Sequence, residues 1–492
     1  MKRYIKKNKL SIYLLILTSI FLFGTAAVCN QCATKPDGQI TEGEGKEVEQ
    51  EEIIEEETRS EFEWFQIGNT QPLTQIQHKS SKELEDNRIG QMVSLKADIH
   101  TNQHADGLVD HNDNLGLKRI RLTIDGFDWT DLESIGTYSE YSIAPYHDRT
   151  ITGLADKGIK ITYTIVFWDE TIQVEKEDYS RFKTEDEIQS YLEYVQFIVH
   201  QFKDRIEYYE ILNEPSIRKG TPQYVEVADY INLVKRTVPV IRQEYPEAKI
   251  VVGAMSPLVE IDNYEYFFSI LNSDIMPLVD AISWHVGAPS PDYEYWQEYY
   301  YNYPSLLQEI RNVASEHGFI GEFIADEHNW RTPETSHLHE PWAYSEIVSA
   351  KYYARGMVIH LGMDITVGLA GVSHIMDLPR MIVFRNLCTI VAGAKPVDLA
   401  VEIQSEENNI ANYNFSLSDG GNLIALWNND IAVDEDSGVE ATIIIHDYPN
   451  LNVRGVDILE GTQQTLVVME ENNNLIIKDL IVRDYPIILH IK

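Results

Sequence analysis

The sequence predicts an α/β protein with a (β/α)8 barrel followed by a small C-terminal β-sandwich. From about Met92 onward, short apolar segments alternate with amphipathic helical segments over roughly 300 residues, which is the size and rhythm of such a barrel. After about Ala394 the helical period stops, and short strands separated by turns follow. A chain of 492 residues also has room for two or three domains. We therefore expect the barrel over residues 66–394 and the sandwich over residues 395–492.

The N-terminus has the pattern of an export signal or membrane anchor over residues 1–28. Five basic residues between Lys2 and Lys9 precede an apolar run from Leu10 to Val28. Three fates are open: cleavage near the small residues 25–27, acylation at Cys29, and retention of the run as an anchor, for which it is just long enough. Each fate places the rest of the chain outside the cytoplasm, secreted or tethered at a bacterial cell surface.

Residues 29–65 are predicted to form an acidic, disordered linker. Between Asp37 and Glu63 the chain carries 12 acidic residues against Lys46 and Arg59. Such a segment repels itself and has too few apolar residues to bury a core. It would serve as a spacer or as a solubilising tail.

The charge and cysteine content exclude several classes of partner and site. The formal net charge is −38, which repels nucleic acid and anionic lipid. Only three cysteines occur, two of them, Cys29 and Cys32, at the export signal, so the folded part has no disulfide framework and no cysteine metal site. Cys388 lies in an apolar helical stretch, where we expect a buried small hydrophobic residue.

The barrel prediction rests on eight short apolar segments, typical of strands buried on both faces. The predicted strands are Met92–Ile99, Arg119–Ile124, Ile159–Phe167, Ile206–Leu212, Ile250–Ala254, Ala281–Trp284, Phe319–Ala325 and Ile365–Leu369. Helical stretches such as Tyr224–Glu244 and Ser305–His317 separate them, and Gly158 and Gly318 fall where a helix should end. A doubly wound open sheet is the alternative, but no Gly-rich phosphate loop opens any of the predicted helices.

The sandwich prediction rests on seven short segments near the C-terminus. They are Leu399–Gln404, Ile410–Leu417, Leu423–Asn428, Glu440–His446, Gln464–Glu470, Leu475–Ile477 and Ile487–Lys492.

The first candidate catalytic residue is Glu214, at the end of the fourth predicted strand. In a barrel of this kind the active site lies at the C-terminal ends of the strands. An apolar strand here ends in Asn213-Glu214, and Pro215 stops it. A carboxyl group at the mouth of an apolar barrel is partly desolvated, which raises its pKa and suits a general acid. A plain turn is the alternative reading of Asn-Glu-Pro.

The seventh predicted strand supplies three further acidic residues. Glu322 begins the strand and so would lie at the wrong end of the barrel. Asp326 and Glu327 both lie at the right end, but strand alternation turns them to opposite faces. The residues alone leave open which of the two points inward.

The chain resembles the clan A glycoside hydrolases, most nearly the xylosidase/iduronidase-like and cellulase-like families. Asn213-Glu214-Pro215 and Glu327 carry the resemblance, which covers roughly Met92 to the C-terminus. It implies Glu214 as acid/base and Glu327, rather than Asp326, as nucleophile of a retaining reaction on an oligo- or polysaccharide, with no metal and no cofactor.

Three further segments match the family pattern. They are Gly116-x-x-x-x-Arg121 on the second strand, Gly253–Pro257 on the fifth strand and Ser283-Trp284-His285 on the sixth. The resemblance implies that Arg121 keeps Glu327 ionised, that Asn213 binds the sugar 2-hydroxyl and that His285 orients the nucleophile. A surface ion pair for Arg121 and an ordinary core role for His285 remain open.

Two departures from the family pattern bear on the substrate. Leu212 stands where many members have Trp before Asn-Glu-Pro, and residues 367–371 lack the Trp that often forms the floor of the sugar subsite. Trp168 and Trp330, and also Trp129, follow other strands and are candidate platforms for a sugar ring.

Two loops hold further candidates. The segment after the sixth strand is expected to be half substrate wall and half core, and contains Tyr293, Tyr295, Trp296, Tyr299, Tyr300, Tyr301 and Tyr303. His337 and His339 are read as solvated rim residues rather than metal ligands.

A non-catalytic carbohydrate-binding surface protein and a transglycosylase are the alternative functions. The sequence leaves the sugar, its linkage and the oligomeric state open.

Overall fold

The computed structural model describes residues 65–123, 142–167, 180–217, 219, 223–333, 343–407, 409–448 and 452–492. The predicted export signal and nearly all of the predicted linker lie outside these ranges. Within them, no helix combines the length and the apolar character needed to cross a membrane.

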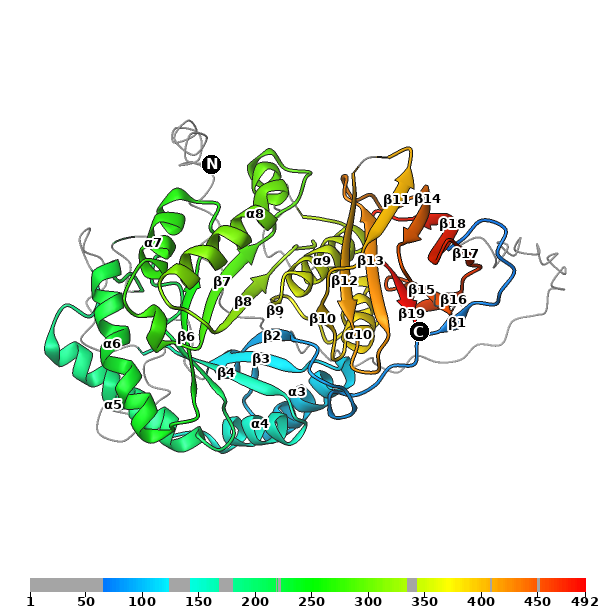
Figure 1. The fold of residues 1–492 in the computed structure, drawn as a ribbon. Helices are drawn as coiled ribbons and strands as arrows, with labels where there is room; N and C mark the ends of the chain where they lie inside the picture. The colour runs from blue at the N-terminus through cyan, green and yellow to red at the C-terminus, as the bar shows by residue number, and fades with distance from the viewer. Residues whose placement is uncertain are drawn as a thin grey trace, which may run out of the picture.

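Eight parallel strands close into a barrel, which confirms the predicted fold class. The sandwich lies beside it, with helices α9 and α10 between the two (Figure 1). The barrel strands are β2 (Ile89–Ser94), β3 (Arg119–Thr123), β4 (Lys160–Ile165), β5 (Tyr208–Ile211), β6 (Lys249–Met255), β7 (Ala281–Gly287), β8 (Glu322–His328) and β9 (Ile365–Leu369).

Helices surround the barrel, and all except α9 are amphipathic because they bury one apolar face. They are α3 (Asn102–Leu115), α4 (Pro145–Asp156), α5 (Glu185–Phe202), α6 (Val227–Glu244), α7 (Ile261–Leu271), α8 (Glu294–Glu316), α9 (Glu346–Gly362) and α10 (Pro379–Ile390). Gly158 and Gly318 have left-handed backbones at φ 68° and 87° after α4 and α8, as their positions predict. Cys388 is buried in α10, as expected.

The first barrel strand differs from its prediction. It ends at Ser94, and α2 (Leu95–Asp98) occupies the rest of the predicted segment. Leu95 and Ile99 are both buried, and the Ile99 amide donates to the Leu95 carbonyl. Their spacing of four residues is that of a helical turn, so the apolar run there is helical rather than extended.

The C-terminal strands form two antiparallel sheets, as the sequence predicts. One contains β1 (Thr74–Gln75), β16 (Thr462–Thr465), β15 (Val453–Asp457), β19 (Ile487–Ile491), β13 (Asn422–Asn428), β12 (Ile410–Ser416) and β10 (Lys395–Pro396). The other contains β11 (Val401–Ser405), β14 (Val439–Ile445), β18 (Asn474–Val482) and β17 (Met469–Glu471). The predicted strand over residues 464–470 is split between the two sheets, and β15 was not predicted.

The start of the described chain belongs to the sandwich rather than to the barrel. Strand β1 pairs with β16, and Gln66 forms a bridge with Leu480 on β18. Phe65 is buried against Gly455 on β15. Residues 65–76 therefore complete the sandwich, which differs from the expected start of the barrel at residue 66.

Helix α9 joins the two domains and is buried on nearly all sides. Arg355 donates from Nε to the Asp484 carbonyl at 2.8 Å and from Nη1 to the Asp430 carbonyl at 2.7 Å. Lys351 forms an ion pair of 2.7 Å with Asp484, and both side chains are buried. These contacts support a bracing role for the sandwich.

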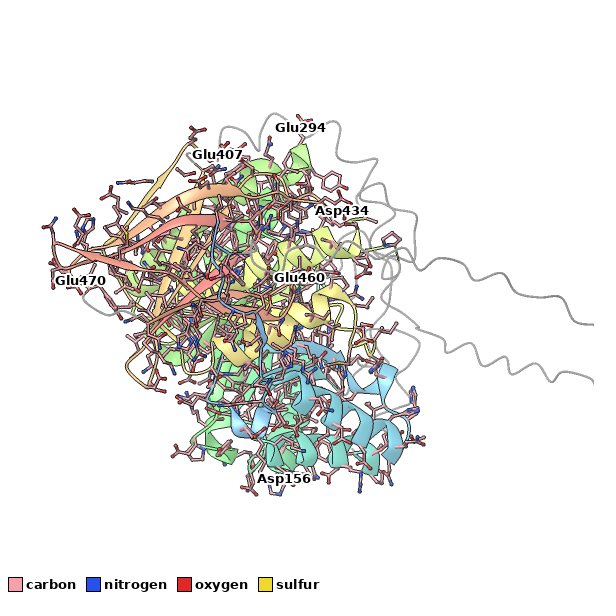
Figure 2. All side chains as sticks on the ribbon, turned by 90° about the vertical axis from the view of Figure 1, so that its right-hand side faces the viewer. Asp156, Glu294, Glu407, Asp434, Glu460 and Glu470 are labelled. Carbon is pink, nitrogen blue, oxygen red and sulfur yellow. The ribbon has the colours of Figure 1, made fainter. Side chains whose placement is uncertain are left out.

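The acidic residues labelled in Figure 2 lie apart from one another over both domains. The labelled residues are Asp156, Glu294, Glu407, Asp434, Glu460 and Glu470. Acidic residues thus occur on the surfaces of both domains, which suits a solubilising role.

Candidate active site

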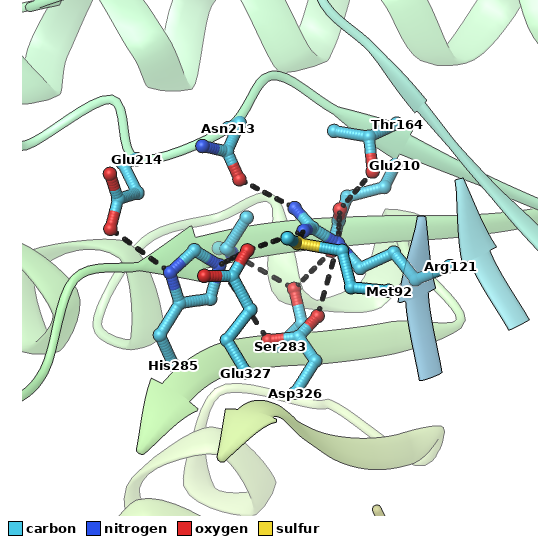
Figure 3. A network of polar contacts seen from close by, with 12 residues as sticks. Met92, Arg121, Thr164, Glu210, Asn213, Glu214, Ser283, His285, Asp326 and Glu327 are labelled. Carbon is cyan, nitrogen blue, oxygen red and sulfur yellow. Dashed lines mark hydrogen bonds and ion pairs between the residues drawn. The ribbon is translucent and has the colours of Figure 1, made fainter. Parts of the chain in front are cut away.

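Arg121 on β3 is the centre of the polar site at the C-terminal end of the barrel (Figure 3). It donates from Nη1 to Glu327 Oε1 at 2.8 Å and from Nη2 to Asn213 Oδ1 at 2.6 Å. Nε donates to Glu210 Oε2 at 2.6 Å and lies 3.3 Å from Asp326 Oδ2. Its side chain is 6% exposed, so the surface ion pair that the sequence left open does not occur. Arg119 instead pairs with Asp86.

Glu210 on β5 is a buried carboxylate that the sequence analysis did not select. Its two oxygens accept three short bonds, from Arg121 at 2.6 Å, Thr164 Oγ1 at 2.8 Å and Ser283 Oγ at 2.6 Å. Burying a charge without such partners is costly. The signal that could have identified it is an acidic residue in the middle of an otherwise apolar barrel strand.

Glu214 follows β5 and has a left-handed backbone with φ 44°. Its amide donates to the Ala254 carbonyl at 2.9 Å, which fixes the backbone against the end of β6. Its carboxylate Oε1 lies 3.0 Å from His285 Nδ1 and is 21% exposed as a side chain. The Ser256 hydroxyl also hydrogen-bonds this carboxylate.

Glu327 and Asp326 both point toward Arg121, although strand alternation predicts opposite faces. The pairing of β8 with β9 shifts register between Ala325 and His328, and Glu327 has φ 56°. A bulge with a left-handed residue turns the second side chain back to the same side. The sequence left open which of the two side chains points inward, and the structure shows that both do. Glu322 lies at the opposite end of β8, as predicted, and its carboxylate accepts a hydrogen bond from the Tyr208 hydroxyl.

His285 on β7 lies between the two candidate catalytic carboxylates. Its Nδ1 faces Glu214 at 3.0 Å, and its Nε2 lies 3.3 Å from Glu327 Oε1. Burial alone would lower the pKa of His285, but the neighbouring carboxylates of Glu327, Glu214 and Asp326 raise it to about 9. The imidazole is thus a cation at neutral pH that bridges both carboxylates, and not an ordinary core histidine.

The pKa of Glu214 differs in direction from the expectation. Burial alone would raise it, as the sequence analysis argued. The hydrogen bond and charge of His285, with smaller effects from Ser256 and Arg121, hold the pKa of Glu214 below its ordinary value. In the free protein the proton of this pair therefore resides on His285, hydrogen-bonded to Glu214.

Several residues at this end of the barrel have a strained, left-handed backbone. Leu212, Glu214, Ala254 and Glu327 all have positive φ values, of 63°, 44°, 43° and 56°. Each such non-glycine residue costs on the order of 1–3 kcal/mol, and persists only where the surrounding structure enforces it. Both candidate catalytic residues are thus held in orientations that an unconstrained strand would not adopt.

Asn213 lies beside Glu214 with its side-chain oxygen bound to Arg121. Figure 3 shows its amide nitrogen on the side of Glu214. The Asn213 carbonyl accepts from Gln223 Nε2 at 2.7 Å, which anchors the turn. An amide donor held next to the acid/base candidate is placed to reach a sugar hydroxyl.

The aromatic predictions have different outcomes. The Trp330 indole donates to the Pro289 carbonyl and packs against Tyr352, Tyr353 and Gly356 of α9. It is 2% exposed, so the prediction that its ring is a sugar platform is wrong: its faces pack against α9. Trp168 lies outside the described residues.

Trp129, His337 and His339 also lie outside the described residues. The tyrosine-rich segment forms the beginning of α8, where Tyr299, Tyr300 and Tyr303 are buried while Tyr295 and Tyr301 are 43% and 45% exposed. In the part of the chain that the structure describes, no three His, Cys, Asp or Glu residues are arranged to hold a metal ion.

Comparison with known proteins places the fold. The sequence model of glycosyl hydrolase family 1 matches residues 90–228. No curated protein matches the chain by sequence. A family 39 glycoside hydrolase from Bacteroides cellulosilyticus is similar in structure, with a TM-score of 0.58, 14% identity, and coverage of 85% of this chain and 83% of that chain.

Two xylanase structures are similar to the same extent. A glycoside hydrolase family 30 subfamily 8 xylanase from Clostridium acetobutylicum has a TM-score of 0.54 and 12% identity, covering 84% of this chain and 97% of that chain. The catalytic domain of a family 30 xylanase from Talaromyces cellulolyticus has a TM-score of 0.54 and 11% identity, covering 85% and 98%. The predicted resemblance to the barrel glycoside hydrolases is thus confirmed at the level of the fold, and the sequence match spans the strands that carry Arg121, Asn213 and Glu214.

Proposed function

We propose that this protein is a retaining glycoside hydrolase that cleaves a β-linked or equivalent equatorial glycoside by double displacement. The observation that carries the proposal is the pair of carboxylates, Glu214 and Glu327, on the two nitrogens of His285, with Arg121 bound to Glu327. Two carboxyl groups facing each other across a small gap are what this reaction requires.

Glu327 is the nucleophile in this proposal. Its oxygen attacks the anomeric carbon while Glu214 delivers a proton to the leaving oxygen, so the glycosidic bond breaks as the glycosyl–enzyme bond forms. The proton comes from the His285–Glu214 pair. Glu214, ionised again, then takes a proton from water, which attacks the anomeric carbon and releases Glu327. Asn213 binds the sugar 2-hydroxyl. Because Arg121 donates to both Asn213 and Glu327, it fixes this amide relative to the nucleophile.

The similar structures, which include xylanases and a glucanase-xylanase, support a proposal for the substrate class. We therefore expect activity on β-linked pentose or hexose polymers. A panel of aryl β-glycosides, xylans and β-glucans is the first assay, with NMR of the anomer that is released first. Retained configuration is expected, and inversion would remove Glu327 from the nucleophile role.

Three variants assign the roles. Glu327→Gln is expected to lose at least about 10³-fold in kcat on every substrate, because no other group forms the covalent bond. Glu214→Gln is expected to keep activity on substrates with good leaving groups, because these need no protonation. Added azide should raise its activity, because azide attacks in place of the activated water. Glu322→Gln is the matched control on the same strand as Glu327, at the far end of the barrel, and is expected to retain wild-type kinetics.

Two other outcomes of the same assay point to different functions. Transfer of the sugar to an acceptor in place of water would indicate a transglycosylase. Glycan binding without turnover, unchanged in both variants, would indicate a carbohydrate-binding protein.

Export is a second part of the proposal. Its support is the basic segment followed by the apolar run Leu10–Val28. Mass spectrometry of the mature N-terminus from a bacterial host separates cleavage, acylation at Cys29 and retention. A cytoplasmic protein with an intact N-terminus would refute export.

A further inference from the structure

Asp326 is a buried carboxyl group in the site that the proposed reaction does not use. The bulge in β8 places it next to Glu327 and on the same side, toward Arg121. It is 2% exposed, and neither of its oxygens accepts a hydrogen bond from the described residues. Gly368 on β9 gives it room, because a Cβ there would lie 2.8 Å from the Asp326 Cβ.

A small cavity inside the barrel adjoins this carboxyl group. It has a volume of about 30 Å³ and is lined by Asp326 together with Gln91, Thr366 and Gly368. A space of this size with polar walls can hold one or two water molecules. A water molecule held there would adjoin the Asp326 carboxyl group, with which it can exchange a proton.

Charged and titratable groups face Asp326 from several surrounding elements. Arg121 Nε on β3 lies 3.3 Å away, and His285 Nε2 on β7 lies 3.7 Å away. Glu210 on β5 and Glu327 on β8 act on it with like charge. Tyr303 on α8 also interacts with it electrostatically. The neighbourhood thus holds two cations, Arg121 and His285, to balance the carboxyl groups of Glu210, Glu214, Asp326 and Glu327.

Two cations cannot fully compensate four carboxylates, two of which, Glu210 and Asp326, are buried, so one buried carboxyl group is best kept neutral. Glu210 accepts three hydrogen bonds, whereas Asp326 accepts none from the described residues, which makes Asp326 the group that gains most from a proton. Consistent with this, burial and the charges of Glu210 and Glu327, against the opposing effects of Arg121 and His285, raise the pKa of Asp326 to about 7.

We propose that Asp326 is a positioning residue whose carboxyl group, when it ionises, helps the His285–Glu214 pair to retain the catalytic proton at higher pH. The proposal rests on the glycosidase function argued above. As the pH rises, Asp326 ionises first and adds a negative charge beside His285. That charge favours the protonated imidazole, so Glu214 still has a proton to give to the leaving group.

The kinetic test compares the pH dependence of kcat/KM in wild type and Asp326→Asn. Asn has nearly the shape of the protonated carboxyl group but cannot ionise. At pH 5 the Asp326 carboxyl group of wild type is protonated and therefore neutral, as the Asn side chain is, so the ratio of the two activities there measures any purely structural effect of the substitution. Its alkaline limb should fall at lower pH than in wild type, by roughly 0.5–1 pH unit for the loss of one nearby charge.

Asp457→Asn is the matched control. Asp457 is equally buried at 1% exposure, and burial likewise raises its pKa, but it lies in the sandwich and binds Tyr485. Its variant should leave the kinetic pH profile unchanged. An alkaline limb at the same pH in wild type and Asp326→Asn would overturn the proposal, as would an equal loss at every pH, which is the signature of a merely structural role.

A second readout does not depend on turnover. NMR titration of the His285 imidazole should give a lower pKa in Asp326→Asn than in wild type, and an unchanged pKa would refute the coupling. If wild type hydrolyses no glycoside, the proposed function fails while this titration still decides the role of Asp326. If the variant does not fold, the carboxyl carbon of Asp326 in wild type serves instead, and titration in the ordinary aspartate range would contradict the proposal.

Discussion

His285 is the residue on which the charges of the site depend. Its imidazole contacts Glu214 at 3.0 Å and Glu327 at 3.3 Å and is almost completely buried. A buried ion without partners costs several kcal/mol, and removing one partner of a buried pair leaves the other uncompensated. The imidazolium is therefore stabilised by the same carboxylates that it orients.

This dependence predicts how stability changes with pH. The folded-state pKa of His285, about 9, lies above its ordinary value of 6.5. The stabilisation from its protonation is fully present below pH 6.5 and is lost as the pH rises through 9, to a total of about 3 kcal/mol. Urea unfolding at a series of pH values should show this loss in wild type and a flatter dependence in His285→Gln.

His200 provides the control for that experiment. It pairs with Glu244 at the surface and is 69% exposed. In His200→Gln the free energy of unfolding should change between pH 6.5 and 9 as it does in wild type, because exposed ion pairs contribute little to stability. Equal slopes in His285→Gln and wild type would show that His285 is not charged in the folded protein.

At the residue scale the sequence identifies the reactive groups better than their surroundings. Glu214 and Arg121 were found because strand ends and the family pattern select them. Glu210 was missed although an acidic residue within an apolar strand is a signal, because that signal does not show which partners the carboxylate meets inside the barrel. Asp326 was set aside because the family pattern selects Glu327, and strand alternation placed the two on opposite faces, which fails at a bulge that depends on the pairing of β8 with β9.

At the scale of elements, two bulges shape the site. The one in β8 brings Glu327 inward, and the one in β6 lies at Gly253 and Ala254. The Ala254 carbonyl accepts a hydrogen bond from the Glu214 amide, and the Ala254 amide donates to Ser283 Oγ at 2.9 Å. The same Ser283 hydroxyl donates to Glu210, so the bulge in β6 links the acid/base residue to the buried cluster.

Gly253→Ala tests this link. Gly253 has φ 117°, and a Cβ there would lie 2.2 Å from the Ser283 carbonyl oxygen. We expect a loss of at least about 2 kcal/mol in the free energy of unfolding, since the backbone of β6 or β7 must move. The shift of Ala254 should also lower kcat by about tenfold or more.

Gly107→Ala is the control for this substitution. Gly107 lies within α3, and nothing lies within 4 Å of a Cβ built there. Alanine should raise stability by roughly 0.5–1 kcal/mol through its helix propensity and leave kcat unchanged. Wild-type stability and activity in Gly253→Ala would mean that the bulge does not position Glu214.

The limits of sequence prediction for elements have a similar cause. Barrel strands were located because burial on both faces leaves continuous apolar runs. The segment Leu95–Asp98 directly follows an apolar strand, and so short a segment does not reveal whether it is extended or helical. Strand β15 contains Arg454 and Gly455 and has no apolar run, so its existence depends on its neighbours β16 and β19.

At the scale of the whole molecule, α9 packs against both the barrel and the sandwich and so joins the two domains. Lys351 and Asp484 form a buried pair at this boundary, with side chains 2% and 4% exposed. Lys351→Met should lower the free energy of unfolding by roughly 3–5 kcal/mol, because the Asp484 carboxyl group loses its counter-ion. Adding Asp484→Asn should cost less than the sum of the two single changes, which a double-mutant cycle by urea unfolding measures.

The surface pair Arg149–Asp106 is the matched control, with side chains 54% and 52% exposed. Arg149→Met should change stability by less than about 1 kcal/mol. If Lys351→Met were as mild as this control, the boundary would not depend on the buried pair.

The sequence predicted both domains in the right order but not how they join. Pairing between β1 and β16 connects residues 389 positions apart, and no local pattern records it. Helix α9 carries buried Lys351 and Arg355 among its apolar residues, and the sequence does not show that their partners lie in the sandwich.

The position of β1 also affects how the chain folds during synthesis. The ribosome produces β1 before any barrel strand, yet its partner β16 appears only when the barrel is complete. The sandwich therefore cannot close until translation is almost finished, and β1 must remain unpaired until then. A truncated protein that ends after the barrel would leave Phe65 and β1 without their partners, so trimming the C-terminus is expected to detach a segment at the opposite end of the chain.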